Sequence, residues 1–246
     1  MPPSHDIAIV LCRVRESGNV GSVCRAMKTM GFKTLILADC PEFDVDKVRM
    51  MAVHAFDVYE GAKKTANLGE ALSDSVLSAG FTRRKGERRK ELSYPVREFA
   101  RLCAARPSGL VSLVFGNEKD GLTDAELAEC TYAVHIPTSD AFPSLNIAQA
   151  VQIACHEFFS LPEASISTMP VKEEGFLPAT RDQIDAEVDF IAETLAKAGF
   201  FRKTDDSHAR HFLREICEKA ALSAIDVKYL GKLFAKAVAL SDRAEP

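Results

Sequence analysis

The stretch GNVGSVCRAMKTMG, residues 18–31, decides the fold class because it follows closely on an apolar run, residues 7–12. Its apolar residues recur at helical spacing on one face, Asn19 is a suitable N-cap, and Gly31 is a suitable C-terminal stop. A strand that runs through a glycine-containing turn into a helix is typical of α/β proteins, and phosphate groups are often bound at such turns. The pattern predicts an α/β fold and raises the question of whether this turn binds a nucleotide.

The glycine spacing in this turn does not match that of the common nucleotide loops. Gly18 and Gly21 are present, but Val23 and Cys24 stand where Gly-x-Gly-x-x-Gly needs its last glycine, and no P-loop pattern follows. A nicotinamide-dependent dehydrogenase is therefore disfavoured. Arg25 lies on the polar face one turn after Gly21, and we expect this glycine to leave open space above the guanidinium. Arg25 is then either a solvated surface residue or a functional one.

Further short apolar runs, each followed by a longer helical pattern, recur through the first 160 residues. This alternation predicts parallel strands joined by helical crossovers, with strands at 7–12, 34–38, 75–79, 109–115 and 133–136. Three prolines and few periodic apolar residues then predict a linker. The expected organisation is a domain over 1–160, a linker over 161–179 and a small all-helical extension over 180–246.

The composition excludes several classes of function. The net charge of −4 over 246 residues argues against a globally basic nucleic-acid coat, so any RNA contact requires a local patch and no DNA partner is expected. The apolar runs fall far short of the roughly 20 residues of a membrane span, and no leader pattern is visible. The seven cysteines are scattered and never form Cys-x-x-Cys, which indicates reduced thiols in a cytoplasmic protein. No cysteine and histidine set has metal-ligand spacing, so we expect no metal.

Two further segments carry polar residues at predicted strand ends, where open α/β sheets bind ligands. In VFGNEKDGLTDAEL, residues 114–127, Gly116 and Glu118 follow the most apolar strand, and Thr123 with Glu126 forms a capping-box pattern. In IPTSDAFPSLNIAQA, residues 136–150, a polar loop leads into a helix that opens near Asn146. Each segment could be ordinary loop and cap structure, but their combination and order favour a binding site.

The run TRRKGERRK, residues 82–90, is strongly basic in an otherwise acidic chain. Such a run is usually solvated surface, but its place directly after a predicted strand favours binding to the phosphates of a nucleic acid, which supply affinity and positioning. The expected phosphate-binding residues are Arg25, Arg84, Lys85, Arg88, Arg89 and Lys90. A second patch in the tail could be formed by Arg202, Lys203, Arg210 and Arg214. With no Trp and four Tyr, recognition of a nucleic acid is expected to rest on its shape.

Three motifs together resemble those of one enzyme family. These are Asn-x-Gly-x-x-x-Arg from Asn19, Phe-Gly-x-Glu-x-x-Gly-Leu from Phe115, and Ile-Pro followed by Ser-Leu-Asn-x-Ala from Ile136. They resemble the motifs of the SpoU branch of the SPOUT RNA 2′-O-methyltransferases, over about residues 6–159. The opening stretch and the tail ETLAKAGFFRK are similar to the bacterial TrmJ type, which carries a C-terminal helical extension.

The resemblance implies a parallel α/β fold with a C-terminal trefoil knot, a homodimer, and S-adenosylmethionine as the methyl donor. It further implies methylation of the ribose of cytidine or uridine at position 32 of the tRNA anticodon loop. The implied cofactor-binding residues are Phe81, Thr82, Arg83, Gly116, Ile136, Pro143, Ser144 and Leu145. A small polar residue is usual in the family where this chain has Phe81, so a side-chain contact there is in doubt.

The implied catalytic residues are Arg25, Asn19, Glu118, Ser144 and Asn146. Because an arginine stays protonated, we expect Arg25 to grip a ribose phosphate and stabilise the developing 2′-oxyanion rather than act as a base. Asn19 would aim Arg25 or only cap a helix, and Glu118 would orient either residue or form a loop ion pair. Ser144 and Asn146 would contact cofactor or ribose, or only cap their helix. The rival functions are ribosomal RNA methylation and a catalytically silent RNA-binding module.

Overall fold

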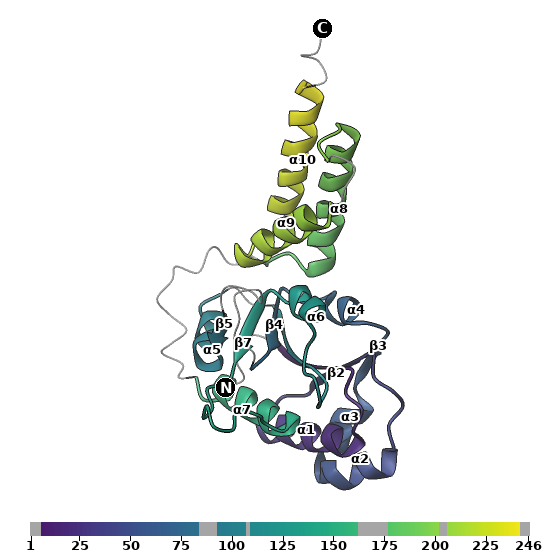
Figure 1. The fold of residues 1–246 in the computed structure, drawn as a ribbon, viewed down its shortest axis with the longest axis vertical. Helices are drawn as coiled ribbons and strands as arrows, with labels where there is room; N and C mark the ends of the chain where they lie inside the picture. The colour runs from purple at the N-terminus through teal and green to yellow at the C-terminus, as the bar shows by residue number, and fades with distance from the viewer. Residues whose placement is uncertain (1–5, 84–92, 107–108, 162–176, 202–205, 242–246) are drawn as a thin grey trace. The chain divides into compact units, whose positions relative to one another are not determined.

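The computed structural model describes the greater part of the 246 residues (Figure 1). The described residues are 6–83, 93–106, 109–161, 177–201 and 206–241. The chain divides into two compact units, residues 1–170 and 171–246. Each unit has a hydrophobic core of its own and is described by itself.

Within the described residues, the first unit is built on a parallel sheet of seven strands in the order β3-β2-β1-β6-β4-β7-β5. The strands are β1 (Asp6–Cys12), β2 (Thr34–Ala38), β3 (Lys63–Thr65), β4 (Leu77–Phe81), β5 (Ser93–Pro95), β6 (Leu110–Phe115) and β7 (Tyr132–His135). The sheet confirms the predicted parallel α/β class. The expected strand at 75–79 begins two residues later, because the Ser75 N–H donates to the Leu72 carbonyl at 2.9 Å in the turn that follows α4 (Leu68–Leu72).

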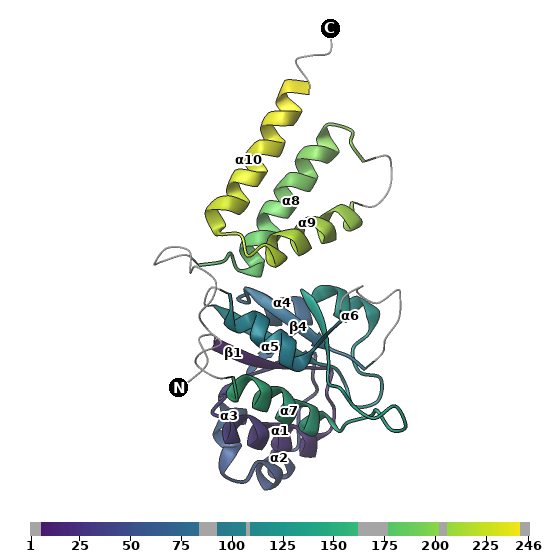
Figure 2. The ribbon, with the colours of Figure 1, turned by 90° about the vertical axis from the view of Figure 1, so that its left-hand side faces the viewer.

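Helices cover both faces of this sheet (Figures 1 and 2). They are α1 (Ser17–Thr29), α2 (Val45–Ala52), the 3-10 turn η1 (Val53–Ala55), α3 (Phe56–Glu60), α4 (Leu68–Leu72), α5 (Val96–Ala104), α6 (Asp124–Glu129) and α7 (Ile147–Phe159). Ile7, Ile9 and Leu11 face the core under α1, α5 and α7, whereas Ala8 and Val10 face α4 and α6. A strand buried on both faces explains why β1 reads as a continuous apolar run.

Helix α1 begins earlier than the sequence pattern indicates. Its N-cap is Glu16, so Asn19 lies inside the first turn and the expected N-cap role is wrong. The C-terminal stop is confirmed, since Gly31 has φ +79° and its N–H donates to the Lys28 carbonyl at 3.1 Å. The left-handed conformation at this position is one that glycine adopts without strain.

Gly21 forms the contact between α1 and α2. A Cβ atom at this residue would lie 2.3 Å from the Val48 carbonyl oxygen and 2.9 Å from the Ala52 nitrogen. The expectation of open space above Arg25 is therefore wrong, because the glycine lets two helix backbones approach closely. The exposed Arg25 lies one turn further along α1.

The described residues of the second unit form helices joined by short loops and no extended strand, as expected for the extension. Its helices are α8 (Arg181–Lys197), α9 (Ser207–Lys219) and α10 (Ala224–Ser241), packed around Ile184, Val188, Cys217 and Val227. Arg210 pairs with Asp206 and Asp189, and Arg214 with Asp185. These two arginines thus hold the helices of the unit together, which disfavours a phosphate-binding role for them, while Arg202 and Lys203 of the expected second patch lie outside the described residues.

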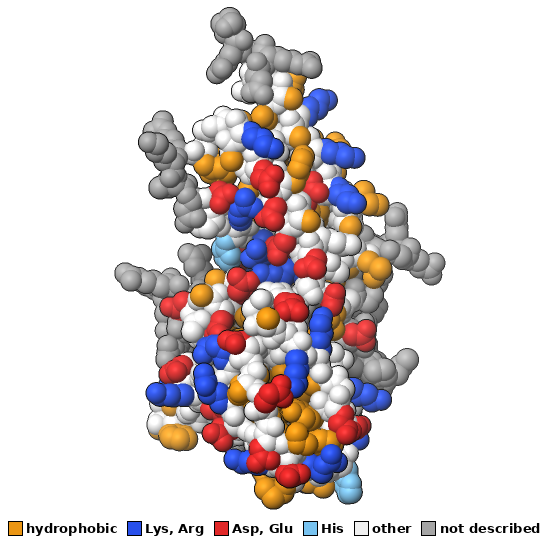
Figure 3. Space-filling model, turned by 90° about the vertical axis from the view of Figure 1, so that its right-hand side faces the viewer, with side chains coloured by type: hydrophobic (Ala, Val, Ile, Leu, Met, Phe, Trp, Pro, Cys, Tyr) orange, Lys and Arg blue, Asp and Glu red, His pale blue; other side chains and the backbone are white. Residues whose placement is uncertain are grey.

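Three findings bear on the class of the protein. No helix in the described part of the chain is long and apolar enough to cross a bilayer. The seven cysteines are free thiols. Acidic and basic side chains are interspersed over the face of the first unit seen in Figure 3, and neither sign dominates it. The trefoil knot stays a prediction.

Candidate active site

A pocket lies at the carboxyl ends of β4, β6 and β7, which are neighbours in the sheet. Its walls come from residues 81–83, from the loop 116–122 and from the segment 136–150 that leads into α7. All eight residues expected to bind the cofactor line it, namely Phe81, Thr82, Arg83, Gly116, Ile136, Pro143, Ser144 and Leu145. Ligand binding at this edge is typical of open parallel sheets.

Two aromatic rings form the floor of the pocket. Phe81 ends β4, Phe115 ends β6, and their rings stack with centroids 4.3 Å apart and planes inclined by 20°. The Phe81 side chain is 9% exposed and belongs to the core between the sheet and α7. Its ring is thus used for packing, which leaves the backbone of residues 81–83 as the polar surface there. This arrangement accommodates phenylalanine where the family usually has a small polar residue.

The loop 116–122 is folded tightly on itself. The Asn117 side-chain oxygen accepts hydrogen bonds from the N–H groups of Lys119 at 3.1 Å and Asp120 at 2.7 Å. A Cβ atom on Gly116 would lie 2.1 Å from the Gly121 carbonyl carbon, so no larger residue fits at position 116 without displacing the loop. Gly121 adopts φ +69°. The glycines of this motif therefore give the pocket wall its shape.

A partly buried ion pair, here called the clip, joins the loop after β1 to this wall. Arg13 pairs with Glu126 on α6, with Nη2 to Oε2 at 2.8 Å, and donates to the Gly121 carbonyl at 3.2 Å. Partial burial raises the pKa of Glu126, but hydrogen bonds from Arg13, Thr123 and Cys12 lower it to about 2. Burial raises the pKa of the Cys12 thiol, which donates to the same carboxylate. Sequence reasoning identified the capping box of Thr123 and Glu126, which is confirmed, but missed Arg13.

A chain of hydrogen bonds links the three sequence motifs beside the pocket. Asn146 Nδ2 donates to Asn19 Oδ1 at 3.0 Å, and Asn19 Nδ2 donates to Glu118 Oε1 at 3.1 Å. The direction of this chain is fixed because Asn146 Oδ1 already accepts from the Ala148 N–H at 2.8 Å as the N-cap of α7. Only the amide nitrogen of Asn146 is free to face Asn19, and each following amide is oriented in turn.

Glu118 is the acceptor at the end of this chain. It also accepts from the backbone N–H groups of Arg15 at 3.3 Å and Glu16 at 3.1 Å, at the start of α1. Partial burial raises the pKa of Glu118, but these hydrogen bonds and that from Asn19 hold it below its ordinary value. The carboxylate is therefore ionised at neutral pH and fixes the N-terminus of α1 against the loop 116–122.

Arg25 and Ser144 are placed differently from this linked group. The Arg25 guanidinium is exposed on α1, does not line the pocket, and makes no hydrogen bond or ion pair to any residue that the structure describes. Ser144 lines the pocket and is exposed, while the helix cap next to it is Asn146. The structure thus brings Asn19, Glu118 and Asn146 together, and leaves Arg25 available to a partner molecule.

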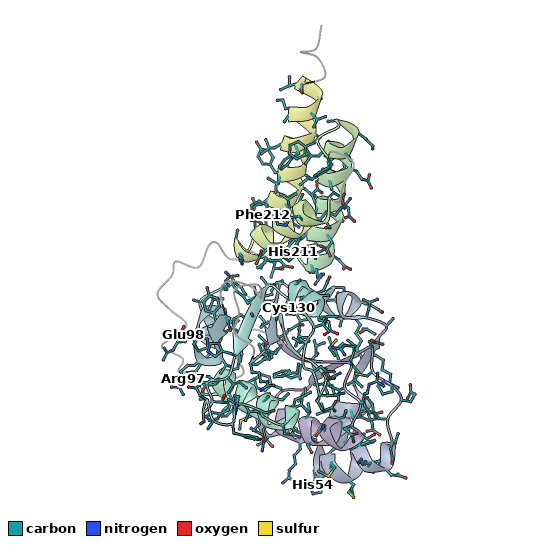
Figure 4. The ribbon with its side chains drawn as sticks, in the orientation of Figure 1. His54, Arg97, Glu98, Cys130, His211 and Phe212 are labelled. Atoms are coloured by element: carbon teal, nitrogen blue, oxygen red, sulfur yellow. The ribbon has the colours of Figure 1, made fainter. Side chains whose placement is uncertain are left out.

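The remaining predicted residues lie mostly beyond what the structure describes. Arg84, Lys85, Arg88, Arg89 and Lys90 fall outside the described residues. Arg83, which precedes them, is exposed at the pocket wall. Away from the pocket, Arg97 on α5 pairs with Glu157 on α7 at 2.9 Å and points outward (Figure 4). Within the described residues no group of three or more His, Cys, Asp or Glu could hold a metal ion.

The fold and the pocket define a parallel α/β protein with a ligand site at the carboxyl ends of its central strands. Residues 6–156 match the SpoU rRNA Methylase family, and the chain belongs to this family. It is 32% identical to the tRNA (cytidine/uridine/adenosine-2′-O-)-methyltransferase TrmJ of Pseudomonas aeruginosa (strain UCBPP-PA14), over 91% of this chain and 90% of that one. It is equally 32% identical to the tRNA (cytidine/uridine-2′-O-)-methyltransferase TrmJ of Yersinia pestis (strain Pestoides F), over 92% and 89%.

Solved structures agree with this assignment of the fold. TrmJ from Z. mobilis ZM4 superposes with a TM-score of 0.76 over 96% of this chain and 99% of that one, at 23% identity. A methylase family protein from Neisseria gonorrhoeae superposes with a TM-score of 0.64 over 76% and 94%, at 31% identity. The first of these matches spans the helical extension as well as the α/β unit.

Proposed function

We propose that the protein is an S-adenosylmethionine-dependent tRNA 2′-O-methyltransferase. The observation that carries this proposal is the hydrogen-bonded chain of Asn146, Asn19 and Glu118, which ties the three family motifs together beside one pocket. The names of the relatives, which align over nine-tenths of the chain, support tRNA as the substrate. Those names differ in the bases accepted, so cytidine and uridine are proposed here and adenosine is a further candidate.

The pocket suits the methyl donor in the chemistry of its walls. Its apolar surface comes from Ile136, Leu145 and the Phe115 floor, which can hold an adenine ring. Irregular backbone in the loop 116–122 and before Asn146 supplies amide and carbonyl groups for the polar parts of the molecule. Ligand pockets are commonly of this kind, with apolar walls and a few placed polar groups.

When bound, S-adenosylmethionine supplies a sulfonium methyl group, which the ribose 2′-oxygen accepts as the carbon–sulfur bond breaks and the hydroxyl proton is released. Arg25, with no partner among the described residues, can hold a phosphate bidentately and stabilise the negative charge on the 2′-oxygen. Glu118 and Asn146 hold Asn19 and thereby the start of the helix that carries Arg25. Ser144, which lines the pocket, would contact the cofactor or the ribose.

The partner and location follow from the same proposal. Arg83 and the basic run after it would bind tRNA phosphates, and Arg25 would bind the phosphate next to the target ribose. We further propose position 32 of the anticodon loop as the target, a homodimer as the active form, and the cytoplasm as the location. Neither DNA nor a membrane is a proposed partner.

The test is methyl transfer from labelled S-adenosylmethionine to unmodified tRNA transcripts. Wild type is compared with Arg25→Ala and with Arg101→Ala, which removes an exposed arginine of α5 as a matched control. We expect transfer that is lost with Arg25→Ala, retained with Arg101→Ala, and lost when nucleotide 32 is a deoxynucleotide. Transfer that survives the deoxy substitution contradicts the target position, and transfer to ribosomal RNA alone contradicts the substrate class. Absence of both transfer and cofactor binding would favour a silent RNA-binding module.

A further inference from the structure

Phe142 is a solvent-exposed aromatic residue that does not itself line the pocket but directly precedes three residues that do. It is 78% exposed, more than any other aromatic side chain that the structure describes. It lies in the segment between β7 and α7, which projects from the body of the first unit (Figure 2). The three residues that follow it, Pro143, Ser144 and Leu145, all line the pocket. A substrate that enters the pocket from this side would therefore meet the Phe142 ring.

The local backbone restricts the conformation of Phe142. Phe142 precedes Pro143, and a residue before proline is restricted to extended conformations. On the other side, the Ala141 N–H donates to the Ser139 hydroxyl at 3.3 Å and forms a turn. A ring with two side-chain torsions on a restricted backbone loses little conformational entropy on binding. The exposed and conformationally restricted Phe142 is therefore suited to contact with a bound molecule.

The charges around the pocket favour a nucleic acid as the molecule that covers the ring. Arg83 and Lys119 both line the pocket, are exposed, and form no ion pair with any described residue. Two carboxylates line the pocket as well: Glu118 accepts hydrogen bonds from Asn19 and from the start of α1, and Asp120 is exposed. Two such cations suit the phosphates of an RNA strand. Asp140, two residues before Phe142, would repel a phosphate at that point of the loop. The phosphates then lie toward the cations, and a base rather than a phosphate faces the ring.

We infer that Phe142 stacks on an unpaired base of the substrate RNA next to the methylated nucleotide. The inference rests on the proposed function and adds a substrate-binding residue to it. Stacking of a base on an aromatic side chain is tolerant of base identity and strengthens the binding of single-stranded loops. This differs from the sequence-based expectation that recognition rests on RNA shape alone, since one exposed ring suffices for one base.

The test compares Phe142→Ala and Phe142→Trp with wild type. Phe159→Ala is the matched control, because Phe159 is also exposed and lies at the opposite end of α7. We expect Phe142→Ala to raise the KM for tRNA about tenfold, with kcat at saturating tRNA and the Kd of S-adenosylmethionine unchanged. Phe142→Trp should keep the wild-type KM, and so should Phe159→Ala. The salt dependence of tRNA binding should stay the same in all variants, since no phosphate contact is removed.

Transcripts with single abasic sites in the anticodon loop identify the stacked base. At that site the loss of the base should weaken binding to wild type about tenfold and binding to Phe142→Ala hardly at all, which is the coupling expected of two groups in contact. Equal losses for both proteins at every site would overturn the inference. Two other results for Phe142→Ala would also overturn it. A higher Kd for S-adenosylmethionine would mean that the loop covers the cofactor, and dissociation of a dimer into monomers would mean that Phe142 contacts a second copy of the chain. Absence of methyl transfer by wild type refutes the proposed function instead, and the binding comparison is read separately from it.

Discussion

Replacing Asn19 by aspartate changes a single atom and tests the direction of the hydrogen-bonded chain. In the structure, Asn19 Nδ2 donates to Glu118 Oε1 at 3.1 Å, while Asn19 Oδ1 accepts from Asn146 at 3.0 Å. In Asn19→Asp the donor becomes an oxygen of the same size, and two carboxylates face each other across that distance. The contact with Asn146 is unaffected. The change therefore converts one favourable contact into a repulsive one without altering the shape of the site.

The magnitude follows from the loss of one hydrogen bond and the gain of one repulsion. A hydrogen bond to a charged group contributes about 1.5–3 kcal/mol. Two like charges about 4 Å apart repel by about 1 kcal/mol in water and more where solvent is partly excluded. The folded state is then destabilised by about 3 kcal/mol when both groups are ionised. Since about 1.4 kcal/mol equals one pKa unit, the repulsion raises the pKa of the pair by about one unit or more.

Urea unfolding, followed by circular dichroism at 222 nm between pH 5 and 8, measures this effect. In folded Asn19→Asp the raised pKa means that the folded state binds more protons than the unfolded state near pH 5, so its stability falls as the pH rises. Asn19→Ala removes the hydrogen bond without adding charge, and its deficit should not depend on pH over this range. If the free energies of unfolding of Asn19→Asp and Asn19→Ala changed with pH in the same way, the reasoning would be refuted, because Glu118 could then not be the neighbour of residue 19.

Three further substitutions test other parts of the structure by the same unfolding measurement. The clip with Arg13 lowers the pKa of Glu126 to about 2, so Glu126→Gln should lower the free energy of unfolding by about 2–3 kcal/mol at pH 7. This loss of stability should disappear as the pH falls from about 5 to 2, because the wild-type carboxylate becomes protonated. An equal loss at pH 7 and at pH 2 would contradict the ion pair. Gly21→Ala places a Cβ against the backbone of Val48 and should destabilise by about 1–3 kcal/mol. Gly231→Ala meets only the end of a flexible glutamate side chain and should cost less than about 1 kcal/mol, so equal losses for the two glycines would contradict the helix contact.

The pocket could be predicted from the sequence because its residues lie in short segments at strand ends. Buried parallel strands read as apolar runs, and their carboxyl ends meet at one edge of the sheet. The family resemblance then selected residues 81–83, Gly116, Ile136 and 143–145, all of which line the pocket. Local signals such as the stop at Gly31 and the cap at Asn146 were readable for the same reason.

The features that could not be predicted depend on contacts distant in sequence. Arg13 and Glu126 are 113 residues apart, and no local pattern indicates that a loop arginine will meet a capping glutamate. The role of Gly21 depends on the path of α2, and Asn19 lost its expected cap role because α1 begins earlier. The edge strands β3 and β5 are three residues long and partly exposed, so they carry no apolar run to detect.

The clip at Arg13 also bears on the order in which the molecule folds. Arg13 can reach Glu126 and the Gly121 carbonyl only after β1 has paired with β6, which is about a hundred residues away in the chain. Asn19 in turn requires Asn146, a separation of 127 residues. Contacts of such long range close late, because the loop entropy must be overcome first. During synthesis on the ribosome the site is therefore assembled after the strands of the sheet, and a nascent chain that ends before α7 can carry these strands but not a linked active site.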